Sequence, residues 1–203
     1  MMMEQGEYKD SIILALRQKY EEERDKHRAI EQERGAGEDI ATVRRVSLLE
    51  GKCSILLPES MTDMGEMERM VKYRNRNKPL LIKTDEMGDA TIIFHMLPKE
   101  EKGRMDIGKE LEEIRGKMRR IWKQNVFYDT GKVLAGELQV AWMDFRTFCL
   151  DGSLYCLLFL FEAGELTVLG NFHCSFPKYD MWKPVILKLL TTIETDAETR
   201  RKP

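Results

Sequence analysis

The stretch DGSLYCLLFLFEAGE, residues 151–165, is the most apolar part of the chain and decides its fold. Eight consecutive apolar residues, 154–161, lie between turn-forming residues at either end. A helix that crosses a bilayer needs about 20 apolar residues, so this stretch is too short to be one. In a strand, alternate side chains point to opposite faces, and here both faces are apolar. The stretch therefore predicts a central strand that other elements cover on both sides.

Two turn signals flank this strand and predict its register. A two-residue turn at 151–152 (Asp-Gly) would place Thr147 opposite Cys156. A two-residue turn at 163–164 (Ala-Gly) would place Asn171 opposite Cys156.

Further apolar runs predict the rest of the sheet and two helices that cover it. The other expected strands span residues 42–49, 53–57, 80–84, 90–96, 137–150 and 165–174. One helix follows Asp106, an N-cap residue, and runs to Trp122. The other spans residues 180–194, with Pro184 in its first turn. A shorter helix is expected within the methionine-rich residues 61–70.

These elements predict the α+β class. The expected architecture is an α/β/α sandwich, in which helices cover both faces of a central, mostly antiparallel sheet.

An N-terminal helical arm is expected outside the sandwich. Apolar residues recur at every fourth position in the first half of residues 8–34, whereas the second half is charged on all sides. Glycines at 35–37 should end this helix. The chain then divides into an arm and linker (1–38), one domain (39–196) and a disordered tail (197–203). The arm is either solvated or pairs with a partner, including a second copy in a homo-oligomer.

Composition limits the cellular location and the classes of partner that we expect. The 203 residues include 33 basic and 35 acidic ones, a net charge of −2, which gives no global attraction to nucleic acid or to an anionic membrane. Local charged patches on the surface are still compatible with such a partner. The N-terminus lacks the pattern of a secretory signal, so we expect a cytoplasmic protein that binds neither nucleic acid nor membrane. The cysteines form no C-x-x-C pair, so we expect buried thiols, no metal and no cofactor.

The order of the elements, and the turns between them, resemble those of a known fold family. The stretches that carry the likeness are SILLPESM, VKYRNRNKPLLIKTDEMGDATIIFHML, LDGSLYCLLFLFEAGELTVLGNFHC and MWKPVILKLLTTI. Over residues 43–194 they are similar to the PsbP-like family, whose fold also occurs in DcrB-type bacterial proteins and in a Ran-binding nuclear-import factor. The chain looks most like uncharacterised intracellular bacterial members. The resemblance implies a binding or assembly role and transfers no site residue, because it rests on no chemical motif.

The sequence VKYRNRNKP offers a candidate interaction patch. If this run is extended, Lys72, Arg74, Arg76 and Lys78 lie on one side of it. A solvated edge whose charges discourage aggregation is the simpler interpretation, and contact with an acidic partner is the functional one.

Asp144 and Arg146 form a candidate ligand-binding pair, because they share a strand face with Phe148. The alternatives are an ion pair near the end of the sheet, or exposure by a bulge between Trp142 and Phe145.

A nucleophilic site could be composed of Cys156, His173 and Asn171, but it would lie in the middle of the sheet under a helix. His173, diagonal to the thiol, would also be too distant to bond it. We therefore expect no catalysis there and no enzyme activity.

Two hypotheses for function remain. The first is a non-enzymatic interaction module, such as an accessory or immunity-like protein, that binds another protein through a sheet edge, the arm or the basic run. The second is a small-ligand binder or weak enzyme with a pocket between sheet and helix, walled by the methionines of residues 61–70. A deep pocket containing His95, or Asp144 with Arg146, would favour the second.

Overall fold

The computed structural model describes most of the expected domain, within the unit Ile40–Pro203. The described residues are 42–73, 79, 81–97, 106–150, 152–164 and 166–195. The expected arm and tail lie outside them, as do Arg74, Arg76 and Lys78 of the basic run. What the sequence predicts for these parts stays a prediction.

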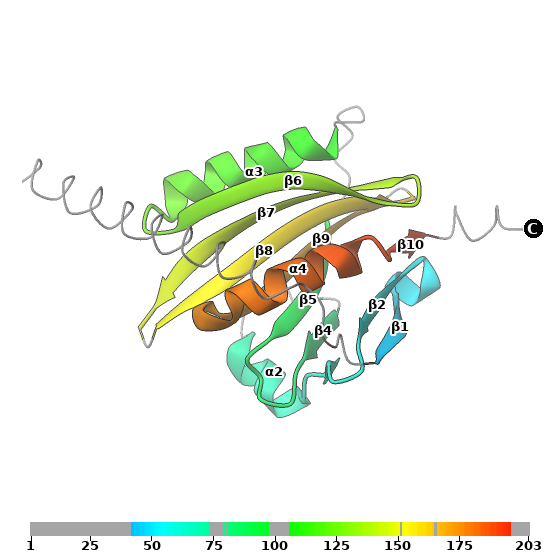
Figure 1. Cartoon of the computed structure of the whole chain (residues 1–203), viewed down its shortest axis with the longest axis horizontal. Helices are drawn as coiled ribbons and strands as arrows, with labels where there is room; N and C mark the ends of the chain where they lie inside the picture. The colour runs from blue at the N-terminus through cyan, green and yellow to red at the C-terminus, as the bar shows by residue number, and fades with distance from the viewer. Residues whose placement is uncertain are drawn as a thin grey trace, which may run out of the picture. The chain divides into compact units, whose positions relative to one another are not determined.

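Seven strands form a large sheet in which every neighbouring pair is antiparallel (Figure 1). In spatial order they are β3 (Thr62–Asp63), β4 (Leu81–Thr84), β5 (Thr91–Leu97), β9 (Leu166–Ser175), β8 (Gly152–Ala163), β7 (Leu138–Cys149) and β6 (Val126–Ala135). The α+β class with a mostly antiparallel sheet is therefore confirmed. The strands expected between residues 80 and 174 all form, and β6 and β3 are additions.

The apolar stretch forms β8, which has a partner strand on each side and apolar side chains buried on both faces. Its odd-numbered residues pack in one core cluster and its even-numbered residues in another. The first set is Tyr155, Leu157, Phe159 and Phe161, and the second is Cys156, Leu158 and Leu160. The period of two read from the sequence therefore fixes which side chains face which layer.

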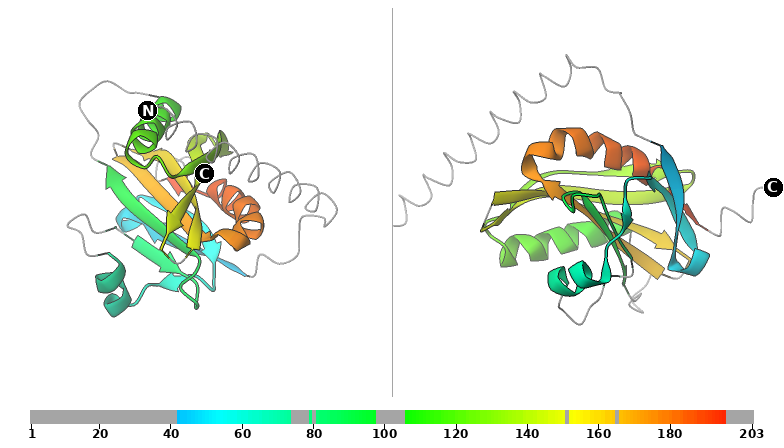
Figure 2. Two further views of the ribbon diagram at one scale, coloured as in Figure 1. Left: turned by 90° about the vertical axis from the view of Figure 1, so that its left-hand side faces the viewer. Right: turned by 90° about the horizontal axis from the view of Figure 1, so that it is seen from below.

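Helix α3 (Ile107–Ile121) packs on the even-numbered face, where Ile107 and Leu111 are buried. Its expected cap is confirmed, because the Asp106 carboxylate accepts the backbone N–H groups of Gly108 and Lys109 at 2.8 and 3.3 Å. Figure 2 (right) shows α3 and α4 (Tyr179–Leu190) on opposite sides of the sheet.

Replacing Asp106 with alanine should lower the melting temperature by about 2–4 °C, because two N–H groups of the first turn lose their acceptor. Thermal unfolding followed by circular dichroism measures the change. Lys132→Ala is the control, because it removes the exposed ion pair with Asp106 and leaves the cap. Equal melting of Asp106→Ala and Lys132→Ala would contradict a role for the cap.

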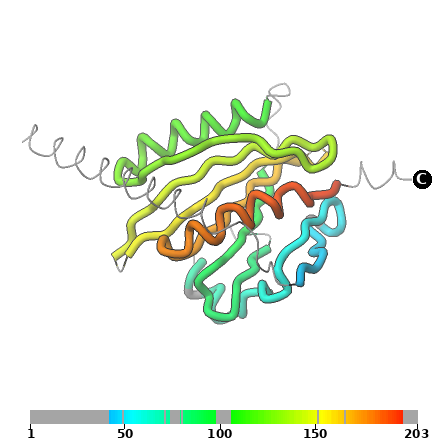
Figure 3. The backbone as a smooth tube through the Cα atoms, viewed as in Figure 1, coloured from blue at the N-terminus to red at the C-terminus, as the bar shows by residue number. Residues whose placement is uncertain are grey.

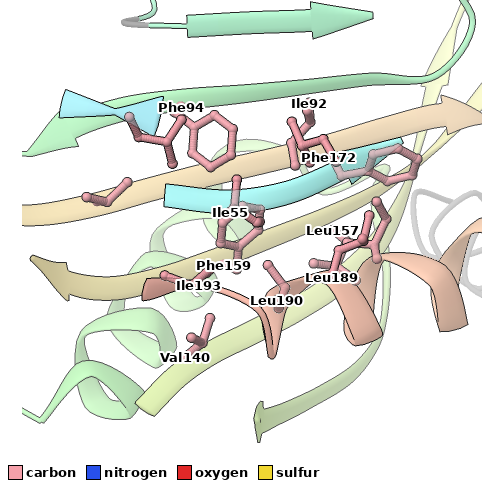
Figure 4. Close-up of a cluster of buried hydrophobic side chains, with 14 of the residues drawn as sticks. Ile55, Ile92, Phe94, Val140, Leu157, Phe159, Phe172, Leu189, Leu190 and Ile193 are labelled. Carbon is pink, nitrogen blue, oxygen red and sulfur yellow. The ribbon is translucent and has the colours of Figure 1, made fainter. Parts of the chain in front are cut away.

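The odd-numbered face is covered by α4 together with a second sheet, which the sequence did not predict. This sheet has the order β1 (Val43–Leu48), β2 (Cys53–Pro58) and β10 (Glu194–Thr195). In the close-up of the core, Ile55 of β2 and Leu190 of α4 lie near Phe159 of β8 (Figure 4). Because β10 pairs with β2, the last strand ties the C-terminal helix to the first hairpin.

The expected helix boundaries change in two places. Helix α4 follows a 3₁₀ turn, Phe176–Lys178, and spans Tyr179–Leu190 rather than the expected 180–194, with Pro184 inside it rather than in its first turn. The proline removes one intrahelical N–H donor there. The methionine-rich segment becomes β3 and then α2 (Glu66–Lys72).

The register predicted for the β7–β8 hairpin is wrong by two residues. Cys149 pairs with Gly152 and Thr147 pairs with Leu154, whereas the predicted turn paired Thr147 with Cys156. Gly152 belongs to the strand, which moves the turn one position earlier.

The β8–β9 turn shifts the other way. Ala163 pairs with Leu166, and Gly164 has a φ of 64°, as the first central residue of a tight hairpin turn requires. Cys156 therefore lies directly opposite His173, whereas the sequence predicted Asn171 there.

A bulge interrupts β6, the unexpected strand. Phe127 pairs with Phe145 and Thr130 pairs with Met143, so two residues of β6 lie opposite Asp144 alone. The sequence placed a bulge at this level but on β7. The extra residue belongs to its neighbour, and it brings the β6 backbone next to Asp144.

Candidate functional site

Strand β6 ends the large sheet and, among the described residues, pairs only with β7. Ala135 pairs with Leu138 across a two-residue turn, so the backbone hydrogen bonds to β7 fall on odd-numbered residues beyond the bulge. The N–H and C=O groups of the even-numbered residues therefore point toward the open edge. These residues are Thr130, Lys132 and Leu134.

An open groove of about 660 Å³ lies beside this edge. It is bounded by the first turns of α3, by Thr130, Gly131 and Lys132 of β6, and by Trp142 of β7. A Cβ on Gly131 would come within 2.9 Å of the Trp142 ring, so glycine at this position lets the indole lie against the strand. We call the outward backbone of β6 and this groove the β6 edge site.

An ion pair joins α3 to the β6 edge site. The Lys132 Nζ lies 3.2 Å from the Asp106 carboxylate and 3.4 Å from Gln139 Oε1. Its hydrogen bond holds the pKa of the Asp106 carboxyl below its usual value. Because both side chains are about half exposed, their pairing is weak and the groups can exchange it for contacts with a bound partner.

Asp144 lies in a buried charge cluster that involves α4. Its carboxylate accepts the Asp129 backbone N–H at 2.7 Å and the Tyr155 hydroxyl at 3.0 Å, and lies 2.7 Å from Lys183 Nζ. Lys183 also pairs with the Asp129 carboxylate at 2.8 Å. The Asp144 side chain is fully buried, so this cluster fastens α4 to the bulge of β6 and offers no carboxylate oxygen to solvent.

Arg146, the expected companion of Asp144, contacts a different set of groups. Its Nε donates to Ser153 Oγ at 2.9 Å, and its guanidinium lies 3.8 Å from the centre of the Phe176 ring. It also hydrogen-bonds Tyr128, whose pKa burial raises to about 12. The structure thus brings Asp144 and Arg146 onto one face but gives each its own partners.

Cys156 and His173 are directly opposite each other, closer in register than the sequence predicted. Burial raises the pKa of the Cys156 thiol to about 12 and lowers the pKa of His173 to about 4. At neutral pH the pair is therefore a protonated thiol and a neutral imidazole. A protonated thiol is a poor nucleophile, so this arrangement favours a structural role.

The basic run contributes one described residue, Lys72. Its Nζ lies 2.7 Å from Glu68 Oε1 and 3.4 Å from the Gly88 carbonyl, against the β4–β5 turn. Met61 and Met64, which precede α2, are buried. Neither they nor the other methionines of residues 61–70 line the groove, and nor do His95 or Asp144.

Within the described ranges, no group of three or more His, Cys, Asp or Glu residues is placed to hold a metal ion. No helix in the same ranges is both long and apolar enough to cross a membrane.

The architecture matches solved structures. The solution structure of cyanobacterial PsbP (CyanoP) from Synechocystis sp. PCC 6803 superposes with a TM-score of 0.57, at 10% identity, over 79% of this chain and 96% of that one. The fold is PsbP-like. The expected resemblance is therefore confirmed. No protein-family model matches the sequence, and no curated protein does.

Two further structures with the PsbP-like fold superpose less closely. The Ran-binding protein Mog1p of Saccharomyces cerevisiae gives a TM-score of 0.47 at 9% identity, covering 76% of this chain and 96% of its own. LpqN, involved in cell envelope biogenesis of Mycobacterium tuberculosis, gives 0.46 at 11% identity, covering 76% and 92%. At 10% identity the likeness to CyanoP shows the fold alone, so the β6 edge site has to be interpreted from its own geometry.

Proposed function

We propose that the protein is a non-enzymatic interaction module that binds an extended segment of a partner protein along β6. The observation that carries this proposal is the open edge of β6 beside a groove. An added strand would hydrogen-bond the outward backbone groups of Thr130, Lys132 and Leu134. Every second side chain of that strand would then point toward α3 and the groove.

The protective features of the edge support this location for a partner strand. Proteins commonly shield an exposed edge with a bulge or a charged side chain. In β6 the bulge between Phe127 and Thr130 shields the first half, and the second half has only Lys132 as a charged residue. Leu134 is 63% exposed there. The second half therefore has the geometry and the apolar character that strand addition uses.

A small ligand in the groove is the second candidate, because a volume of about 660 Å³ falls in the range of ligand pockets. The walls of this groove are mostly apolar, like those of such pockets, but the groove is open to solvent and would leave much of a small ligand exposed. Its borders also carry the charged side chains of Asp106, Lys109, Glu112 and Lys132. Charged borders suit a peptide segment better, since its backbone and side chains can replace the water on these groups.

Leu134→Pro is the sharpest test of strand addition. Proline removes the outward N–H of residue 134 and leaves the hydrogen bonds to β7 intact, so the sheet should tolerate it. We expect the full-length variant to lose its partners in affinity capture with mass spectrometry. The matched control, Leu134→Ala, shortens the same side chain and keeps the N–H, so it should retain them.

Two measurements make this outcome decisive. Circular dichroism should show the same strand content for Leu134→Pro and wild type. Capture with a chain that lacks residues 1–38 shows whether partners bind the arm instead. The β6 proposal fails if Leu134→Pro is folded and keeps every partner that wild type binds.

A further inference from the structure

One end of the domain gathers the C-terminus of α3, the tip of the β7–β8 hairpin and the start of α4. All three lie at the left in Figure 1, and Figure 2 (left), which looks onto this end, shows the hairpin between the two helices. The tube in Figure 3 traces the same three segments to this end. Its surface chemistry differs from that of the β6 edge site.

The last turns of α3 are strongly basic and exposed. Residues 115–123 hold five cationic side chains and no acidic one. We call the exposed side chains of this segment the α3 end patch: Lys117, Arg119, Arg120, Ile121, Trp122 and Lys123. Cations near the C-terminus of a helix interact favourably with the helix dipole, which accounts for the positive charges of this segment. The dipole does not account for Ile121, which is 67% exposed, or for Trp122, which is 44% exposed.

The other two segments at this end add exposed apolar side chains. Leu150 is fully exposed at the tip of the β7–β8 hairpin, and Met181 in the first turn of α4 is 57% exposed. Asp151 follows Leu150 in the sequence, so this hairpin contributes an apolar side chain together with one negative charge. Three separate elements therefore present apolar residues at one end, and one of them adds a basic cluster.

We propose that this end of the domain docks reversibly on an anionic lipid bilayer. The α3 end patch would contact the lipid headgroups, while Ile121, Trp122 and Leu150 enter the interface. A net charge of −2 gives no global attraction, so the local cluster supplies it. Tryptophan beside lysine and arginine is typical of protein surfaces that lie at the membrane–water boundary.

The other anionic partners fit this end less well. Nucleic acid uses cations and aromatic rings for phosphates and bases, and it gives no role to exposed Ile121, Leu150 and Met181. A protein partner anchors its central contacts in well-packed pockets, whereas Leu150 is a fully exposed hairpin tip. A bilayer accepts projecting apolar side chains from several elements at once, because it has no fixed shape to match.

Co-sedimentation of the full chain with vesicles tests the proposal. Wild type should bind vesicles made of equal parts phosphatidylserine and phosphatidylcholine, should bind phosphatidylcholine alone much less, and should be released by salt. Arg120→Gln with Lys123→Gln should weaken binding about twenty-fivefold, since each cation near an anionic leaflet contributes about fivefold. The fluorescence of Trp122 should shift to the blue on binding, and Trp122→Phe should remove that shift.

The matched control removes two exposed cations elsewhere. Lys52→Gln with Lys188→Gln changes the net charge equally. Lys52 lies in the turn before β2 and Lys188 in the last turn of α4, and Figure 1 shows the start of β2 and the end of α4 toward the opposite end of the domain. This variant should bind nearly as well as wild type. Equal weakening by both double variants, or no binding of wild type to anionic vesicles, overturns the proposal. Binding of a single-stranded oligonucleotide or of polyglutamate without vesicle binding also overturns it and assigns the α3 end patch to that partner class. These assays need no protein partner, so they are independent of the β6 edge site.

Discussion

Asp144→Ala should destabilise the domain by about 3 kcal/mol, because it leaves a largely buried lysine without its nearest carboxylate. Lys183 keeps its pair with Asp129, and its side chain retains 18% exposure, so the loss falls at the lower end of what breaking a buried ion pair costs. The Tyr155 hydroxyl and the Asp129 N–H also lose their acceptor. Urea or guanidinium unfolding of the full chain measures the free energy.

Two variants separate the parts of this effect. Asp144→Asn keeps an acceptor for Tyr155 and should cost less than the alanine. Asp129→Ala removes a carboxylate that is 37% exposed, and should cost only about 1 kcal/mol because solvent weakens such pairs. If Asp144→Ala unfolds at the same denaturant concentration as wild type, the cluster does not fasten α4 to the sheet.

The sequence predicted the parts of the fold that depend on local periodicity. The residues Leu154 to Phe161 are all apolar, so a strand formed by them requires cover on both faces and had to be a central one. The N-cap at Asp106 was equally predictable, because the carboxylate reaches N–H groups only two and three residues away. Such local signals do not depend on how the rest of the chain packs.

Strand β6 escaped prediction because its pattern is broken at the bulge. Asp129, Thr130 and Gly131 are typical turn residues, and together they interrupt the alternation that marks a strand. The short Gly136–Glu137 turn before β7 was the available signal, since a tight turn there requires a strand before it. The β6 edge site, which lies on this strand, was therefore not predictable as a site.

The charge cluster around Asp144 shows a second limit of prediction from sequence. Sequence alone places Asp144 and Arg146 on one face, because they are two residues apart in a strand. The partner that Asp144 pairs with is Lys183, which a helix brings from far along the chain. Which of several lysines meets a buried carboxylate depends on how α4 packs on the sheet, and periodicity carries no such information. The register error in the β8–β9 turn at Gly164 likewise concealed the direct pairing of Cys156 with His173.

Gly170→Ala is the other substitution with a large expected effect, about 3 kcal/mol of destabilisation. Gly170 in β9 pairs with Phe159 of β8 and Phe94 of β5, and a Cβ there would overlap the Phe159 ring. The Phe159 ring cannot move away easily, because it is fully buried and packs edge-on against Phe94 at 5.8 Å. Denaturant unfolding measures the loss.

A second glycine and a second-site change test the cause. Gly116 lies in α3 with nothing within 4 Å of an added Cβ, so Gly116→Ala should stabilise the domain by about 0.5–1 kcal/mol. Phe159→Leu removes the ring that meets the new methyl group, so the double variant with Gly170→Ala should be more stable than the sum of the two single losses. Strict additivity would mean that the Phe159 ring is not what excludes a side chain at position 170. Since Phe159 belongs to the apolar stretch that places β8 at the centre of the sheet, rescue by leucine would also show that the close packing of β8 on β9 depends on glycine at 170.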